Sequence, residues 1–286
     1  MSIDIKSFFD QDTFSMTYVV SDKATAMGVI IDSVLNFDPA SGKTTTSSAD
    51  EVCAYVEEND INIQYIFETH VHADHITASP YLQNKLGGKT AIGEGVKLVQ
   101  KTFAPVFNIE DSCKADGSQF DLLLKDGDQL TLGESSIKVM HTPGHTPACV
   151  SYVIDDAVFV GDTLFMPDFG TSRTDFPGGN AKTLCASLRA LLSLPNETRM
   201  LMCHDYAPGG REYMWETTVA EQKQNNIHIH DGISDDEFIA MREGRDKSLG
   251  MPRLILPAVQ VNIRAGLLPK AEQNGVQYLK LPINQF

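Results

Sequence analysis

Six of the eight histidines lie in three short windows of the chain. The first window, residues 69–75, reads THVHADH and follows a predicted strand. The second, residues 141–145, reads HTPGH, and the third holds a single histidine, His204, at the end of another predicted strand. Asp162 follows a further predicted strand. Imidazole and carboxylate ligands together suit zinc, iron, manganese or nickel better than calcium or magnesium, so the windows predict a transition-metal site.

The spacing within the first window indicates how its side chains converge. Residues two apart in an extended segment face the same way, so His70, His72 and Asp74 can share one side. His75 follows as the chain turns into a predicted helix over 76–86. Asp is a preferred helix N-cap, and Asp74 could serve as one. A capping role for Asp74 leaves His70 and His72 unexplained, and Asp74 could cap the helix and also bind the metal.

Three other histidines are weaker candidates. His141 shares a loop with His145, and a structural role explains it as well as metal contact does. His228 and His230 alternate on a predicted surface segment, where we expect plain polar side chains.

The elements that must position these residues alternate between strands and helices, which predicts two sheets covered by helices on their outer faces. The C-terminal part carries a predicted helix over 234–245 and an apolar, strand-like run over 254–263. We expect a helix over 211–225 and a tight hairpin at Asp155 and Asp156. No shift in composition marks a second domain, so we expect one domain over 1–286 with a C-terminal extension from about residue 231.

The composition excludes several function classes. The chain has 286 residues, is 42% hydrophobic, and has a formal net charge of −15. Such acidity disfavours binding to nucleic acid and to anionic lipid, but it allows a small anionic substrate in a local basic pocket. No apolar stretch is long enough to span a membrane, and the acidic N-terminus does not resemble a targeting signal. Five scattered cysteines without a CxxC motif fit a reducing compartment, so we expect a cytoplasmic protein.

The motifs THVHADH, HTPGH and GDTLF, followed by a later histidine at a strand end, resemble the metallo-β-lactamase superfamily. The resemblance implies an αββα sandwich with metal at one edge of the two sheets. It also implies two overlapping ligand sets: one consists of His70, His72, His145 and Asp162, and the other of Asp74, His75, His204 and the shared Asp162.

A narrower resemblance covers nearly the whole chain. The stretch 171–176 (TSRTDF), the window 204–206 (HDY) and the tail 256–266 (LPAVQVNIRAG) are similar to the bacterial branch of the persulfide dioxygenases, or sulfur dioxygenases. That family implies a single ferrous ion held by His70, His145 and Asp162, while the other ligand positions stay present without a second metal. Two histidines and one carboxylate also form the facial triad of non-haem iron oxygenases.

The resemblance implies a reaction in which glutathione persulfide, dioxygen and water give glutathione and sulfite. We expect one Fe(II) per chain, with zinc or manganese as substituted metals. Asp74, His75 and His204 are then expected beside the iron as proton-handling groups. Arg173 is a candidate contact for the anionic glutathione part, or else a surface salt bridge. Tyr206 could donate a hydrogen bond near the metal or pack beside His204.

A glyoxalase II type thioester hydrolase with two metals is the closest alternative, since it needs the same seven ligands. The Arg173 stretch and the tail do not resemble the glutathione-binding region of that enzyme. A secreted β-lactamase and a metal-stabilised binding module are less favoured. We expect a separate rhodanese or sulfide:quinone oxidoreductase to supply persulfide and, by family analogy alone, a homodimer. Cys149 and Cys203 are expected to be buried small hydrophobes.

Overall fold

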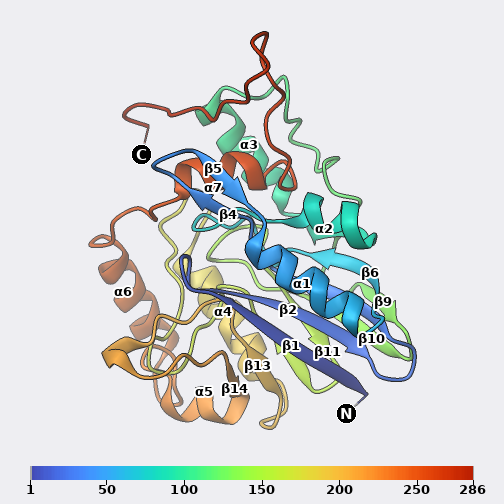
Figure 1. Cartoon of the computed structure of the whole chain (residues 1–286). Helices are drawn as coiled ribbons and strands as arrows, with labels where there is room; N and C mark the ends of the chain where they lie inside the picture. The colour runs from blue at the N-terminus through green and yellow to red at the C-terminus, as the bar shows by residue number, and fades with distance from the viewer. Residues whose placement is uncertain (1, 286) are drawn as a thin grey trace.

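Two six-stranded sheets face each other in the computed structural model, which describes residues 2–285 (Figure 1). The first sheet is antiparallel across its first three strands and parallel across the rest. Its strands, in spatial order, are β1 (Ile3–Asp10), β2 (Ser15–Asp22), β3 (Met27–Ile31), β6 (Asn62–Phe67), β7 (Lys89–Gly93) and β8 (Leu122–Leu124).

The second sheet is antiparallel except where β12 pairs with β13. Its spatial order is β14 (Glu216–Thr218), β13 (Arg199–Leu201), β12 (Ala157–Phe159), β11 (Val150–Ile154), β10 (Ser135–His141) and β9 (Gln129–Leu132). Asp155 and Asp156 form the predicted tight hairpin between β11 and β12, with Asp155 at a φ of 52°. A separate small hairpin joins β4 (Asn36–Asp38) to β5 (Lys43–Thr45).

Alternating side chains divide the core into layers. In β2, Tyr18 and Val20 point between the sheets, while Val19 points outward, as the period of two in a strand requires. Helices α1 (Ser47–Glu58) and α2 (Ser79–Leu86) cover the outer face of the first sheet. Helices α4 (Ala181–Leu192), α5 (Val219–Asn225) and α6 (Asp235–Asp246) pack over the second. The predicted αββα sandwich is therefore confirmed.

Helices α3 (Val96–Phe107) and α7 (Ile255–Asn262) pack together in a further apolar cluster. The strand-like interpretation of 254–263 is wrong, because this run forms α7. Ile255, Ala258, Val259 and Asn262 are all buried, which is the spacing of one helical face. A short run rich in β-branched residues does not by itself distinguish a buried strand from a buried helix.

The helix predicted over 211–225 is wrong in its first half. That segment follows a short 3₁₀ turn (Pro208–Gly210) and runs extended into β14 before α5 begins. Asp205 accounts for the extended path, because its carboxylate accepts hydrogen bonds from the Arg211 guanidinium and from the backbone amide of Met214.

No helix among residues 2–285 has the length and apolar character needed to cross a bilayer.

Candidate metal centre

All the histidine windows leave their strands at one edge of the sandwich. The first window follows β6, the second begins at the end of β10, Asp162 follows β12, and His204 follows β13. Loops at strand ends are where a rigid scaffold presents functional side chains. The two sheets thus bring together residues that lie as far apart in sequence as His70 and His204.

One group consists of His70, His145 and Asp162, whose ligand atoms lie within 4.8 Å of one another. Nε2 of His70 and Nε2 of His145 each lie 3.7 Å from Oδ2 of Asp162. The outer nitrogens are occupied: His70 Nδ1 lies 3.0 Å from the Thr69 hydroxyl, and His145 Nδ1 donates to the Arg173 carbonyl at 2.8 Å. These outer hydrogen bonds fix the rings with Nε2 facing the group.

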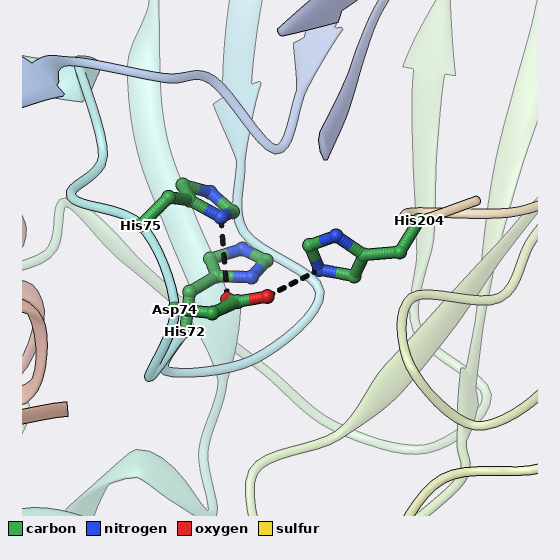
Figure 2. A group of neighbouring side chains, drawn as sticks. All are labelled: His72, Asp74, His75 and His204. Carbon is green, nitrogen blue, oxygen red and sulfur yellow. Dashed lines mark ion pairs between the residues drawn. The ribbon is translucent and has the colours of Figure 1, made fainter. Parts of the chain in front are cut away.

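A second group consists of His72, Asp74, His75 and His204 (Figure 2). His204 Nε2 lies 3.1 Å from Asp74 Oδ2 and 3.3 Å from Asp162 Oδ1, so Asp162 joins the two groups. His75 Nδ1 lies 3.5 Å from Asp74 Oδ1. All seven superfamily ligand positions predicted from the sequence are therefore brought together.

The unpartnered atoms of this cluster fit a metal ion. Among the described residues, four buried atoms at the centre lack a hydrogen bond: His72 Nδ1, His75 Nε2, His204 Nε2 and Asp162 Oδ1. A buried polar atom without a partner is costly, and four in one place require an explanation. A bound cation gives each of them a partner, and nitrogen and carboxylate donors suit a transition metal.

Two carboxylates that the sequence analysis missed contact the ring nitrogen of His72 that faces away from the cluster. Its Nε2 lies 3.0 Å from Asp32 Oδ1 and 3.2 Å from Glu68 Oε2. Burial lowers the pKa of His72, but Asp32 and Glu68 outweigh burial and raise it well above its ordinary value. This arrangement leaves Nδ1 facing the cluster. Their positions could have pointed to them from the sequence, since Asp32 directly follows β3 and Glu68 directly follows β6, as the ligands follow their strands.

The pKa shifts of the other ligands run in both directions. Burial lowers the pKa of His204, but Asp74 and Asp162 outweigh burial and raise it above its ordinary value. Burial lowers the pKa of His70 well below its ordinary value, and neighbouring histidines lower it further. Burial also lowers the pKa of His75. Burial raises the pKa of Asp74, but His204 and His75 outweigh burial and hold it well below its ordinary value. Neutral imidazole and ionised carboxylate are the forms that bind metal.

A cavity of about 400 Å³ opens over the cluster, with Asp74, His145 and Asp162 in its lining. Its size falls within the range of small-molecule sites. The apolar and aromatic lining comprises Phe14, Phe165, Phe169, Phe176, Tyr206 and Leu249. Four arginines also line it: Arg173, Arg242, Arg245 and Arg253. An acidic chain therefore has a local cationic pocket beside its candidate metal centre.

Arg173 and Tyr206 both line this cavity. Arg173 donates to both oxygens of Asp175 at 2.6 Å and to the Gly250 carbonyl at 2.6 Å. It thus forms the salt bridge considered from the sequence while also lying at the cavity. The Tyr206 ring stacks on His204 with an interplanar angle of 13° and a centroid separation of 5.8 Å.

Three weaker expectations are settled by position. His141 is exposed, its Nε2 lies 3.1 Å from the Pro147 carbonyl, and it joins neither ligand group. Asp74 does not cap a helix, since α2 begins only at Ser79. The surface placement of His228 is wrong: its side chain is buried, and Nδ1 accepts a hydrogen bond from the Thr171 amide at 3.0 Å.

Cys149 and Cys203 are buried free thiols, as expected. Burial raises the pKa of Cys149 to about 12, so its thiol stays protonated. Burial likewise raises the pKa of Cys203 well above its ordinary value. Reactive cysteines depend on the thiolate, which neither residue presents.

Comparison with known families identifies this arrangement. The metallo-beta-lactamase superfamily matches residues 22–204, which include every ligand position. The chain belongs to the metallo-β-lactamase superfamily. It is 51% identical to a probable metallo-hydrolase of Burkholderia pseudomallei, over 98% of this chain and 99% of that one. It is 48% identical to glyoxylase B2 of Dictyostelium discoideum, over 98% and 97% of the two chains.

Two further relatives carry the name ETHE1, and one of them is named as a persulfide dioxygenase. Human mitochondrial persulfide dioxygenase ETHE1 is 29% identical over 92% of this chain and 89% of that one. The crystal structure of ETHE1 from Myxococcus xanthus superposes with a TM-score of 0.74 at 33% identity, and the match covers 92% of this chain and 100% of that one. The chain is therefore similar to proteins named as a metallo-hydrolase, a glyoxylase and a persulfide dioxygenase.

Proposed function

We propose that this protein is a persulfide dioxygenase, which converts glutathione persulfide, dioxygen and water to glutathione and sulfite. The observation that carries the proposal is the group of His70, His145 and Asp162, two members of which line an aromatic-walled cavity. Two histidines and one carboxylate are the ligand set of non-haem iron oxygenases. Similarity to ETHE1 from Myxococcus xanthus along 92% of this chain supports the same assignment.

The proposed cofactor is one Fe(II) per chain, held by His70, His145 and Asp162. Bound there, ferrous iron supplies redox chemistry between a sulfur anion and dioxygen, and zinc or manganese would be substituted metals. Three protein ligands leave coordination positions free for other groups.

The chain's own residues prepare the cavity for such a substrate. Phe165, Phe169 and Phe176 give it apolar walls that exclude water. Burial raises the pKa of Tyr206 well above its ordinary value, so its hydroxyl stays protonated and can donate a hydrogen bond to bound substrate. The Asp74–His75 pair, 3.5 Å apart, lies beside the first ligand group, where it can accept and pass on a proton. Arg173 is the proposed contact for the anionic part of glutathione.

Oxygen consumption tests the proposal. Anaerobically iron-loaded protein is given glutathione persulfide, and oxygen uptake, sulfite and metal per chain are measured together. We expect rapid uptake, an equal amount of sulfite, and about one iron per chain. Absence of uptake by iron-loaded protein would refute the assignment.

The persulfide would come from a separate rhodanese or sulfide:quinone oxidoreductase, and we propose that the protein works as a homodimer.

A glyoxalase II type thioester hydrolase is the second candidate, and the complete second ligand group favours it. His72, Asp74, His75 and His204 have ligand atoms close enough to hold another ion. Two metals together can generate a bound hydroxide for hydrolysis. Hydrolysis of a glutathione thioester by protein carrying about two metals per chain, without oxygen uptake, would establish this alternative.

A further inference from the structure

The four arginines of the cavity differ in how many of their donors are already in use. Arg242 is 1% exposed, forms an ion pair with Asp246 at 2.6 Å, and donates to the Thr171 carbonyl at 3.0 Å. Arg173 is bonded to Asp175 and Gly250, and its guanidinium lies 4.6 Å from the centre of the Phe176 ring. Asp246 neutralises Arg242 and Asp175 neutralises Arg173, so the anionic groups of a ligand need further cations besides Arg173.

Arg245 and Arg253 differ from the other two because both are exposed at the cavity. Within residues 2–285, neither guanidinium forms an ion pair, and the Arg245 side chain has no hydrogen bond. Arg253 makes a single weak one, from Nη2 to the Asp12 backbone carbonyl at 3.3 Å. In a chain with a net charge of −15, two arginines without a direct ion pair beside one cavity are a local reversal of charge.

The lining residues differ in how deeply they are buried, and this difference indicates how a ligand would lie in the cavity. Asp162 and His145 are only 8% and 5% exposed, so they form the floor, whereas the exposed Arg245 and Arg253 form the rim. The aromatic lining residues span both levels, from Phe165 at 6% exposed to Phe14 at 37%. A ligand that fits this profile has a reactive group at one end, an apolar stem, and anionic groups at the other end.

We propose that Arg245 and Arg253 form a rim subsite that binds the carboxylates of a peptide-like thiol and directs its sulfur to the His145–Asp162 floor. The planar guanidinium fork matches a carboxylate in geometry and charge. Asp12, an exposed carboxylate that also lines the cavity, can accept an ammonium group of the same ligand. This subsite rests on the proposed function for its reactive sulfur, but its anion binding can be measured without turnover.

Binding of S-methylglutathione, a ligand with no reactive sulfur, tests the subsite directly. Calorimetry on the metal-loaded protein should show binding that weakens roughly tenfold in Arg245→Ala and in Arg253→Ala. The matched control is Lys247→Ala, an exposed cation in the same segment that does not line the cavity. It should bind as the unaltered protein does. Equal affinity in all four proteins, or no binding to any of them, would overturn the subsite.

Kinetics with three persulfides separate the subsite from the reaction. For glutathione persulfide, each arginine variant should raise KM roughly tenfold and leave kcat within about twofold. With the diester of glutathione persulfide, which lacks both carboxylates, the variants should match the unaltered protein. A KM effect confined to coenzyme A persulfide would overturn the carboxylate assignment in favour of phosphate. Weakened S-methylglutathione binding without any persulfide oxidation would support the subsite and refute the dioxygenase.

Discussion

Asn262 in helix α7 donates a hydrogen bond of 2.8 Å to the backbone carbonyl of His72, which lies 190 residues earlier in the chain. The same amide nitrogen donates to the His75 carbonyl at 2.8 Å, and its oxygen accepts from the Thr77 amide at 3.0 Å. One buried side chain thus fixes the loop that carries four of the seven ligand positions. The C-terminal helix therefore positions the metal centre without contributing a ligand.

Replacing Asn262 with Ala should weaken metal binding by roughly 10- to 100-fold, the usual effect of losing a residue that supports metal ligands. Stability should also fall by about 1–3 kcal/mol for each buried group left unpaired. Metal retention against a graded chelator series, together with urea unfolding, measures both effects.

The control is Gln260→Ala in the same helix. Within residues 2–285 its side-chain amide donates to the carbonyls of Leu256 and Lys280 and accepts from the Lys280 backbone amide, and it does not contact the ligand loop. This variant should lose stability but keep its metal affinity. If the two variants lose metal equally, Asn262 acts only through stability of the helix.

Ser15 orients the second ligand group. Its hydroxyl lies 3.1 Å from His75 Nδ1 and 3.4 Å from His204 Nδ1, on the sides of the rings opposite the unpartnered Nε2 atoms. Ser15→Ala should therefore lower the affinity for a second zinc equivalent roughly tenfold. The first equivalent should bind as before, since the Thr69 hydroxyl and the Arg173 carbonyl hold His70 and His145.

Stepwise zinc titration of apo-protein measures both affinities. Ser21→Ala, on the same strand and remote from the ligands, serves as the control and should leave both steps unchanged. A loss in the first step alone would contradict the division into two groups.

The ligand positions were predictable because the information is local. Period-two spacing in the first window predicts His70, His72 and Asp74 on one side. The window bends instead of running as a strand, and His70 joins one ligand group while His72 and Asp74 join the other. The residues that hold the ligands in place were not predictable in the same way, because Asp32 and Asn262 contact His72 from 40 and 190 residues away in the sequence. Such contacts depend on how the sheets and α7 pack. The C-terminal run 254–263 was misread because its apolar residues alone fit a buried strand as well as a buried helix.

The first ligand group should be indispensable. His145→Ala removes a ligand that also lines the cavity, so iron content and oxygen-consuming activity should both fall below about a hundredth of their normal values. The same result is expected for His70→Ala and Asp162→Ala. Metal analysis and an oxygen electrode check this. His141→Ala, in the same loop as His145 but outside both ligand groups, should keep its iron and its activity. Near-normal activity in His145→Ala would refute the site.

His228 should make the stability of the fold depend on pH. Burial lowers its pKa from the ordinary 6.5 to about 4, and the positive charges of Arg242 and Arg245 contribute. The neutral ring accepts the Thr171 hydrogen bond that holds the loop carrying Arg173. The folded protein therefore binds fewer protons than the unfolded chain between pH 6.5 and 4. The neutral His228 ring therefore makes its full contribution to the free energy of unfolding above pH 6.5. As the pH falls toward 4 this contribution is lost, and the free energy of unfolding drops by up to about 3 kcal/mol.

His228→Gln removes the titrating group, so its free energy of unfolding should fall less steeply than that of the unaltered protein between pH 6.5 and 4. Urea unfolding at several pH values, with metal absent from both proteins, measures the difference in slope. His230→Gln, two residues away, is the matched control and should keep the steeper slope, because within residues 2–285 the His230 ring bonds to the neighbouring Asp231 carbonyl and not to the loop that carries Arg173. Parallel curves for the unaltered protein and His228→Gln would mean that the neutral His228 ring does not support the loop.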